Sequence, residues 1–131
     1  MKRKIYEKLL EWKKTSNGRS AVLIDGARRI GKSWIAEEFA RNEYESYLLI
    51  DFSKVSKEVK GFFEDYLEKL DVFFMYLLGA YNAKLTPRKS VIIFDEVQKF
   101  PRAREAIKHL VADGRFDYIE TGSLISIRKN V

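Results

Sequence analysis

The chain contains no cysteine and only one histidine, His109, among its 131 residues. Without cysteine there is neither a disulfide framework nor a thiolate-bound metal. One histidine cannot form a histidine-based metal site alone, so we interpret His109 as an ordinary helix residue. Long apolar runs are also missing, because the longest stretch, Val72 to Tyr81, is far too short to cross a bilayer. The basic N-terminus is not followed by a signal-peptide segment, so we expect a cytoplasmic protein that does not enter a membrane.

The composition is that of a folded domain. Hydrophobic residues make up 46% of the chain and aromatic residues 14%, which argues against disorder. The length predicts one domain over residues 1–131. The net charge is +6, with small basic clusters at 2–4, 28–29 and 128–129. We interpret these as a solvated basic face, and nucleic-acid binding stays open as an alternative.

One motif points to a class of ligand. Residues 26–33 read Gly-Ala-Arg-Arg-Ile-Gly-Lys-Ser and match the phosphate-binding loop G-x-x-x-x-G-K-[ST] at every fixed position. An apolar run precedes the motif and a helical pattern follows it. The glycines let the backbone wrap around a phosphate, and the helix directs its N–H groups and positive dipole end toward it. The predicted nucleotide-binding residues are Gly26, Arg28, Arg29, Ile30, Gly31, Lys32 and Ser33.

Two of these side chains have distinct predicted roles. Lys32 can reach the β- and γ-phosphates of ATP, and the Ser33 hydroxyl can bind Mg²⁺. The expected cofactors are therefore ATP and Mg²⁺.

Strand and helix patterns alternate along the chain. Apolar runs at 20–25, 47–52, 90–95 and 117–121 predict four strands buried on both faces. Helical periodicity predicts helices over 2–14, 32–41, 56–80 and about 101–112. Ser56 is a candidate N-cap, Pro101 suits a first helical turn, and Gly114 suits a helix end. The alternation predicts an α/β fold in which helices cover a parallel sheet.

Polar residues follow two of the predicted strands. The third strand ends in Asp95-Glu96, at the carboxyl edge of the sheet beside the phosphate loop. There Asp95 would hold the Mg²⁺ shell, and Glu96 would orient and polarise an attacking water. At the end of the fourth strand, Thr121 or Ser123 would face the γ-phosphate and the water. The alternative for that segment is an ordinary turn at Gly122.

Three segments together carry a family resemblance. The phosphate loop, Phe94-Asp95-Glu96-Val97-Gln98 and Thr121-Gly122-Ser123 resemble the AAA-type ATPase domain of a widespread prokaryotic family. In that family a C-terminal domain of largely uncharacterised function follows. The resemblance implies a three-layer P-loop NTPase with strand order 5-1-4-3-2. It also implies that Lys32 and Ser33 bind phosphate and Mg²⁺, that Asp95 and Glu96 form the acid pair, and that Thr121 or Ser123 is a sensor.

The sequence departs from that family at its end. Only eight residues follow Ser123, so the fifth strand, the helical lid and the C-terminal domain are expected to be absent. The first strand would then lie at an open sheet edge, which favours self-association besides any AAA-type assembly. No arginine finger is assigned; the candidates are Arg28, Arg29, Arg102, Arg104 and Arg128.

The leading functional prediction is Mg²⁺-dependent ATP binding and hydrolysis. A small-molecule kinase can share the phosphate loop, but Glu96 beside the metal acid favours attack by water. The non-enzymatic alternative is a nucleotide-dependent scaffold or DNA-interacting module with little turnover.

Overall fold

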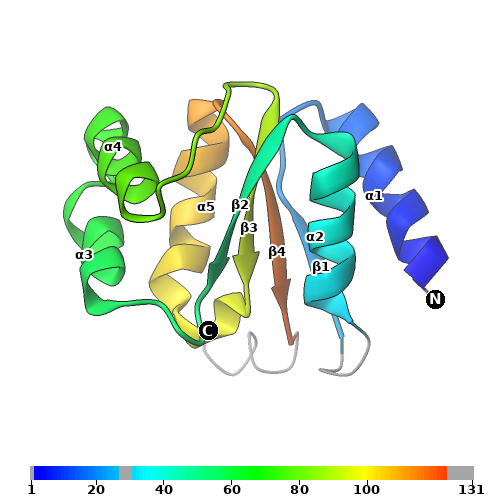
Figure 1. The fold of residues 1–131 in the computed structure, drawn as a ribbon, viewed down its shortest axis with the longest axis horizontal. Helices are drawn as coiled ribbons and strands as arrows, with labels where there is room; N and C mark the ends of the chain where they lie inside the picture. The colour runs from blue at the N-terminus through cyan, green and yellow to red at the C-terminus, as the bar shows by residue number, and fades with distance from the viewer. Residues whose placement is uncertain (1, 27–30, 124–131) are drawn as a thin grey trace.

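Four parallel strands form one sheet in the order β1-β4-β3-β2 (Figure 1). The computed structural model describes residues 2–26 and 31–123. The strands are β1 (Val22–Asp25), β2 (Ser46–Asp51), β3 (Ser90–Asp95) and β4 (Asp117–Gly122). This confirms the predicted parallel sheet and the 1-4-3-2 part of the expected order. Within the described residues β1 pairs with β4 alone.

Helices cover both faces of the sheet and complete a three-layer α/β fold. Helices α1 (Lys2–Ser16) and α2 (Lys32–Glu43) pack on one face. Helices α3 (Lys57–Asp65), α4 (Leu70–Ala80) and α5 (Pro101–Asp113) lie on the other, together with the short 3₁₀ helix η2 (Val97–Lys99). No helix of residues 2–26 and 31–123 is both long enough and apolar enough to cross a membrane. His109 is a residue of helix α5, as predicted, and its side chain is exposed.

The central strands send alternate side chains into two separate cores. From β3, Ile93 packs in the cluster beneath α1 and α2, while Ile92 and Phe94 pack in the cluster beneath α3 to α5. From β4, Ile119 packs in the first cluster and Tyr118 in the second. The period of two along a strand therefore decides which helices each side chain meets.

The prediction that every strand is buried on both faces holds only for the two central ones. All residues of β3 and β4 are buried, whereas β1 and β2 keep partly or fully exposed residues. The reason is their position, because β1 and β2 are the outer strands of the described sheet.

The predicted single helix over 56–80 is wrong, because the structure has two. Ser56 is the N-cap of α3, as predicted, and its hydroxyl accepts a hydrogen bond from Val59 N at 3.1 Å. The first helix ends at Asp65, and the chain turns through residues 66–69 before α4 begins. A continuous helix of that length would span about 37 Å, against about 20 Å for a six-residue strand. Folding back keeps both apolar stripes on one core, where the Phe63 and Phe73 rings meet at 5.0 Å.

The start and end signals of α5 are confirmed. Pro101 occupies its first turn, and Gly114 ends it in the left-handed conformation with φ of 82°. Glycine suits this position because left-handed backbone is strained for other residues.

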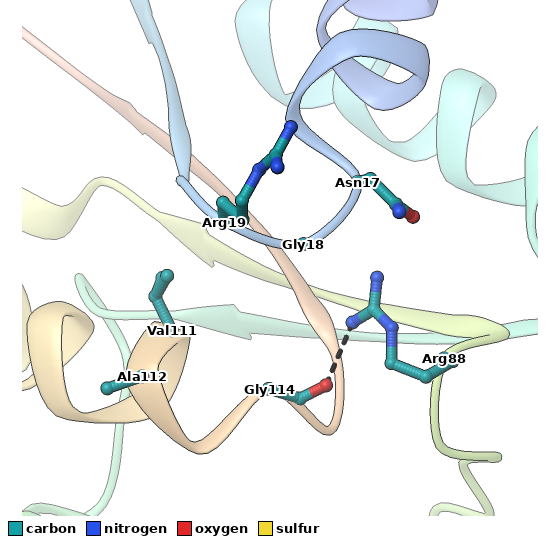
Figure 2. Close-up of a pocket in the computed structure, with 7 residues that line it drawn as sticks. All are labelled: Asn17, Gly18, Arg19, Arg88, Val111, Ala112 and Gly114. Carbon is teal, nitrogen blue, oxygen red and sulfur yellow. Dashed lines mark hydrogen bonds between the residues drawn. The ribbon is translucent and has the colours of Figure 1, made fainter.

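An arginine clasp joins three segments at the amino edge of the sheet (Figure 2). The Arg88 guanidinium donates to Gly114 O at 3.0 Å and to Asp117 Oδ1 at 2.8 Å. It also lies against the α1–β1 turn, where a Cβ placed on Gly18 would lie 2.5 Å from Arg88 Nη2. Tyr44 donates its hydroxyl to the other oxygen of Asp117. Burial and this hydrogen bond to Asp117 raise the pKa of Tyr44. The clasp stands at the edge of the sheet opposite Asp95.

Candidate active site

Residues from α2, β3 and β4 meet on a single carboxylate oxygen. The Ser33 hydroxyl donates to Asp95 Oδ1 at 2.6 Å, and the Thr121 hydroxyl donates to the same oxygen at 2.6 Å. Asp95 and Thr121 end neighbouring strands and are buried, with 6% and 0% exposure. Both lie two residues beyond an isoleucine that packs under α2, so strand alternation points them toward Ser33 at the start of that helix. The predicted metal-binding pair and one predicted sensor are thus in direct contact.

Glu96 leaves β3 in an unusual backbone conformation. Its φ of 54° and ψ of 49° are left-handed, a region that few residues other than glycine occupy. The backbone N–H of Glu96 donates to Thr121 Oγ1 at 3.0 Å, and its carbonyl accepts from Lys99 N at 3.0 Å. The Thr121 hydroxyl therefore binds both members of the predicted acid pair. Such backbone conformations persist where surrounding contacts hold them, and they gather at active sites.

Lys32 is a buried cation at the start of α2. Its exposure is 3%, and its ammonium donates to Gly26 O at 3.1 Å. The same ammonium lies 3.8 Å from Glu96 Oε2. Gly31, just before it, has a φ of 74°, a left-handed conformation that glycine adopts without strain. The ends of the motif thus bring a positive charge to the carboxyl edge of the sheet, beside Glu96.

Gln98 is a contact that sequence reasoning missed. Its side-chain amide donates to Glu96 Oε1 at 2.8 Å from η2. The resemblance already included Gln98 as the last residue of the Asp-Glu-Val-Gln segment, without a role. The signal that could have suggested a role is the position of Gln98, two residues after Glu96. At that separation the two side chains can meet if the chain makes a tight turn directly after the strand.

The other predicted residues are several outside the described part of the chain, Ser123 and the remaining arginine-finger candidates. Arg28, Arg29 and Ile30 lie outside the described residues, as does Arg128. Ser123 directly follows β4 and is partly buried. Among the arginine-finger candidates, Arg102 pairs with Glu105 on α5 itself.

Arg104, another candidate, forms an ion pair within the domain. It donates to Glu120 Oε1 at 2.7 Å. Burial raises the pKa of Glu120, and the hydrogen bond from Arg104 partly opposes that rise. Glu120 precedes Thr121 on β4, so their side chains leave opposite faces of the sheet. The pair joins α5 to the strand that carries Thr121.

The oxygen donors at this edge fit Mg²⁺ bound together with a nucleotide. Ser33 Oγ and Asp95 Oδ1 are hard ligands 2.6 Å apart, close to the ~2.9 Å between neighbouring oxygens in an octahedral Mg²⁺ shell. No group of three or more His, Cys, Asp or Glu side chains that could cage a metal occurs in the part of the chain that the structure describes. One carboxylate, one hydroxyl and substrate phosphates form the kind of shell that Mg²⁺ prefers.

A parallel α/β sheet, a phosphate-loop sequence between β1 and α2, and a carboxylate on β3 beside that loop define a P-loop nucleotide-binding domain. The chain belongs to the AAA domain family, which it matches over residues 18–130. No curated protein and no solved structure matches it significantly.

Proposed function

We propose that this domain binds ATP with Mg²⁺ and hydrolyses the γ-phosphate. The observation that carries the proposal is the 2.6 Å contact between Ser33 Oγ and Asp95 Oδ1, across 62 positions of the sequence. It supports one shared role for the end of the phosphate loop and the carboxylate of β3. The AAA family membership supports nucleotide binding in general.

In this proposal Lys32 binds the β- and γ-phosphates. Its ammonium is buried. Among the described residues, its hydrogen-bond and ion-pair partners are the carbonyl of Gly26 and one carboxylate oxygen of Glu96. A phosphate oxygen carries more negative charge than the carbonyl of Gly26, so it is the stronger partner. Ser33 and Asp95 would hold Mg²⁺, which neutralises charge on the transferring phosphoryl group.

Glu96 is proposed to orient and polarise the attacking water. Its left-handed backbone places the carboxylate next to Lys32, and therefore next to the phosphate that Lys32 would bind. Thr121 is proposed as the sensor, since its hydroxyl contacts both Asp95 and the backbone of Glu96. Ser123 keeps its predicted role as the alternative sensor at the same edge.

A titration with a fluorescent ATP analogue, with and without Mg²⁺, tests binding. We expect binding that depends on Mg²⁺ and is lost in Lys32→Ala. Lys108→Ala serves as a matched control, because Lys108 is exposed on α5. Circular dichroism confirms that each variant is folded. If the folded Lys32→Ala variant bound the analogue as well as the unmodified chain, the proposed site would be wrong.

Release of inorganic phosphate tests catalysis. Glu96→Gln should keep nucleotide binding and lower turnover by about 10²- to 10⁴-fold, the usual contribution of a general base. Products distinguish the alternatives: phosphate found on a small acceptor, with little hydrolysis in its absence, would indicate a kinase. Salt-dependent DNA binding with negligible turnover would indicate the scaffold.

A further inference from the structure

Both oxygens of the Glu96 carboxylate have partners in the structure, and the two partner groups differ in character. Oε1 accepts a hydrogen bond of 2.8 Å from the neutral amide of Gln98. Oε2 lies 3.8 Å from the ammonium of Lys32. The Glu96 side chain is 20% exposed, so water competes only partly for these contacts.

The two partners would respond differently to a nucleotide. Lys32 is the group that binds phosphate in the proposed function, so a phosphate competes with Glu96 for its charge. Gln98 is neutral, so a bound phosphate attracts its amide less strongly than it attracts the Lys32 ammonium, and the hydrogen bond to Glu96 is kept. Occupation of the loop would release Oε2 and leave Oε1 in place.

Gln98 sits on a turn that is fixed at both ends. Val97, beside it, is fully buried in the core under α3 to α5. The backbone N–H of Lys99 donates to Glu96 O at 3.0 Å, and that of Phe100 to Val97 O at 3.1 Å. Because the turn is short and held by these hydrogen bonds, the Gln98 side chain keeps a fixed position relative to Glu96. A residue that positions a catalytic carboxylate needs such a fixed position.

We propose that Gln98 is the positioning residue for Glu96. Its amide keeps the Glu96 carboxylate in place when the Lys32 ammonium exchanges its contact with Glu96 for one with the bound phosphate. This inference rests on the proposed hydrolytic function. Gln98 does not touch the substrate in this scheme, and it acts only through the orientation of the Glu96 carboxylate.

Kinetics of Gln98→Ala give the first test. We expect nucleotide affinity to stay nearly unchanged and kcat to fall by about tenfold to a hundredfold, the loss typical of removing a residue that orients a functional group. Lys99→Ala is the matched control, because Lys99 is an exposed neighbour on the same turn. Unchanged kcat in Gln98→Ala would overturn the proposal.

Gln98→Glu separates positioning from general damage to the fold. The new side chain has nearly the size of the amide, but an ionised carboxylate cannot donate a hydrogen bond to Glu96 Oε1 and repels the Glu96 carboxylate. We therefore expect kcat to fall at least as far as in Gln98→Ala, while urea denaturation shows that the variant is folded. An unchanged kcat in the folded Gln98→Glu variant would contradict the proposal.

Nuclear magnetic resonance tests the contact without turnover. The side-chain amide signal of Gln98, identified by its loss in Gln98→Ala, should move in Glu96→Ala both without nucleotide and with a non-hydrolysable ATP analogue bound. If this signal is insensitive to Glu96→Ala when the analogue is bound, Gln98 does not hold Glu96 at that stage and the proposal fails.

Parallel turnover assays of Glu96→Gln separate the positioning role of Gln98 from the proposed hydrolytic function. If turnover is lost there but kept in Gln98→Ala, only the positioning role is wrong, whereas full turnover in Glu96→Gln overturns both.

Discussion

The hydroxyl of Thr121 donates a hydrogen bond of 2.6 Å to Asp95 Oδ1 on the neighbouring strand. The same hydroxyl accepts the backbone N–H of Glu96 at 3.0 Å. One fully buried side chain thus fixes Asp95 by its carboxylate and Glu96 by its backbone. The relative positions of the two acids depend on this bridge between β3 and β4.

Replacing Thr121 by valine removes the bridge at nearly constant volume. Asp95 then loses one donor and Glu96 N loses its acceptor, so we expect Thr121→Val to lower the free energy of unfolding by about 1–3 kcal/mol. Urea denaturation measures this, and Thr121→Ser, which keeps the hydroxyl, should recover most of the loss. A valine variant as stable as the unmodified chain would show that the bridge contributes little.

The metal dependence of nucleotide binding should reside in Ser33 and Asp95. In Ser33→Ala and Asp95→Asn we expect nucleotide affinity in the presence of Mg²⁺ to fall toward the affinity without Mg²⁺, because hard oxygen ligands are lost while Lys32 is kept. Calorimetric titration with and without Mg²⁺ measures the difference. Asp65→Asn, on an exposed residue at the end of α3, is the control, and a Mg²⁺ effect unchanged in both site variants would exclude this metal site.

The arginine clasp should contribute to stability without affecting nucleotide binding. Arg88→Ala leaves Asp117 buried with one fewer donor, and we expect a loss of about 1–2 kcal/mol in the free energy of unfolding. Arg88 is 42% exposed, which limits the value of its ion pair. Nucleotide affinity should not change, because the clasp lies at the opposite edge of the sheet.

Gly18 tests the same clasp from the other side. Gly18→Ala adds a methyl group where Arg88 Nη2 lies, at a φ of 84°, so we expect a loss of about 1–3 kcal/mol from backbone strain and displacement of the guanidinium. Part of that cost requires Arg88. The double variant should therefore lose less stability than the sum of the two single variants, and strict additivity in thermal unfolding would argue against their contact.

The buried Glu120 makes stability depend on pH in a direction that can be stated. Burial raises the pKa of Glu120 above its usual value, with Arg104 opposing the rise. The folded state then binds this proton more tightly than the unfolded state does. The favourable contribution is full below the unfolded pKa and is lost as the pH rises through the folded one. Glu120→Gln does not titrate, so its stability relative to the unmodified chain should improve as the pH rises through that window.

Urea unfolding at a series of pH values checks this expectation. Glu105→Gln on α5 is the control, because the Glu105 side chain is 66% exposed. A constant difference between Glu120→Gln and the unmodified chain across the series would contradict the assigned cause.

Local signals predicted much of the fold. The sequence predicts the end of the third strand at Asp95 because its apolar run stops there at two acids. Ser56, Pro101 and Gly114 indicate helix ends because a serine hydroxyl caps a helix, proline suits a first turn and glycine adopts left-handed backbone. The turn after Asp65 escaped prediction because an apolar stripe of helical period continues across it. The partial exposure of β1 and β2 escaped because composition does not reveal which strands are outermost.

By itself the sequence determined which residues are the candidates for the proposed chemistry. The phosphate-loop motif and the Asp95-Glu96 pair are contiguous, and their side chains and backbone preferences are local properties. Only the tertiary structure decided that Ser33 and Thr121 share one oxygen of Asp95, that Gln98 turns back onto Glu96, and that Arg88 closes the far edge. These contacts depend on strand pairing, register and the face each side chain takes, and those are fixed only when distant segments pack together.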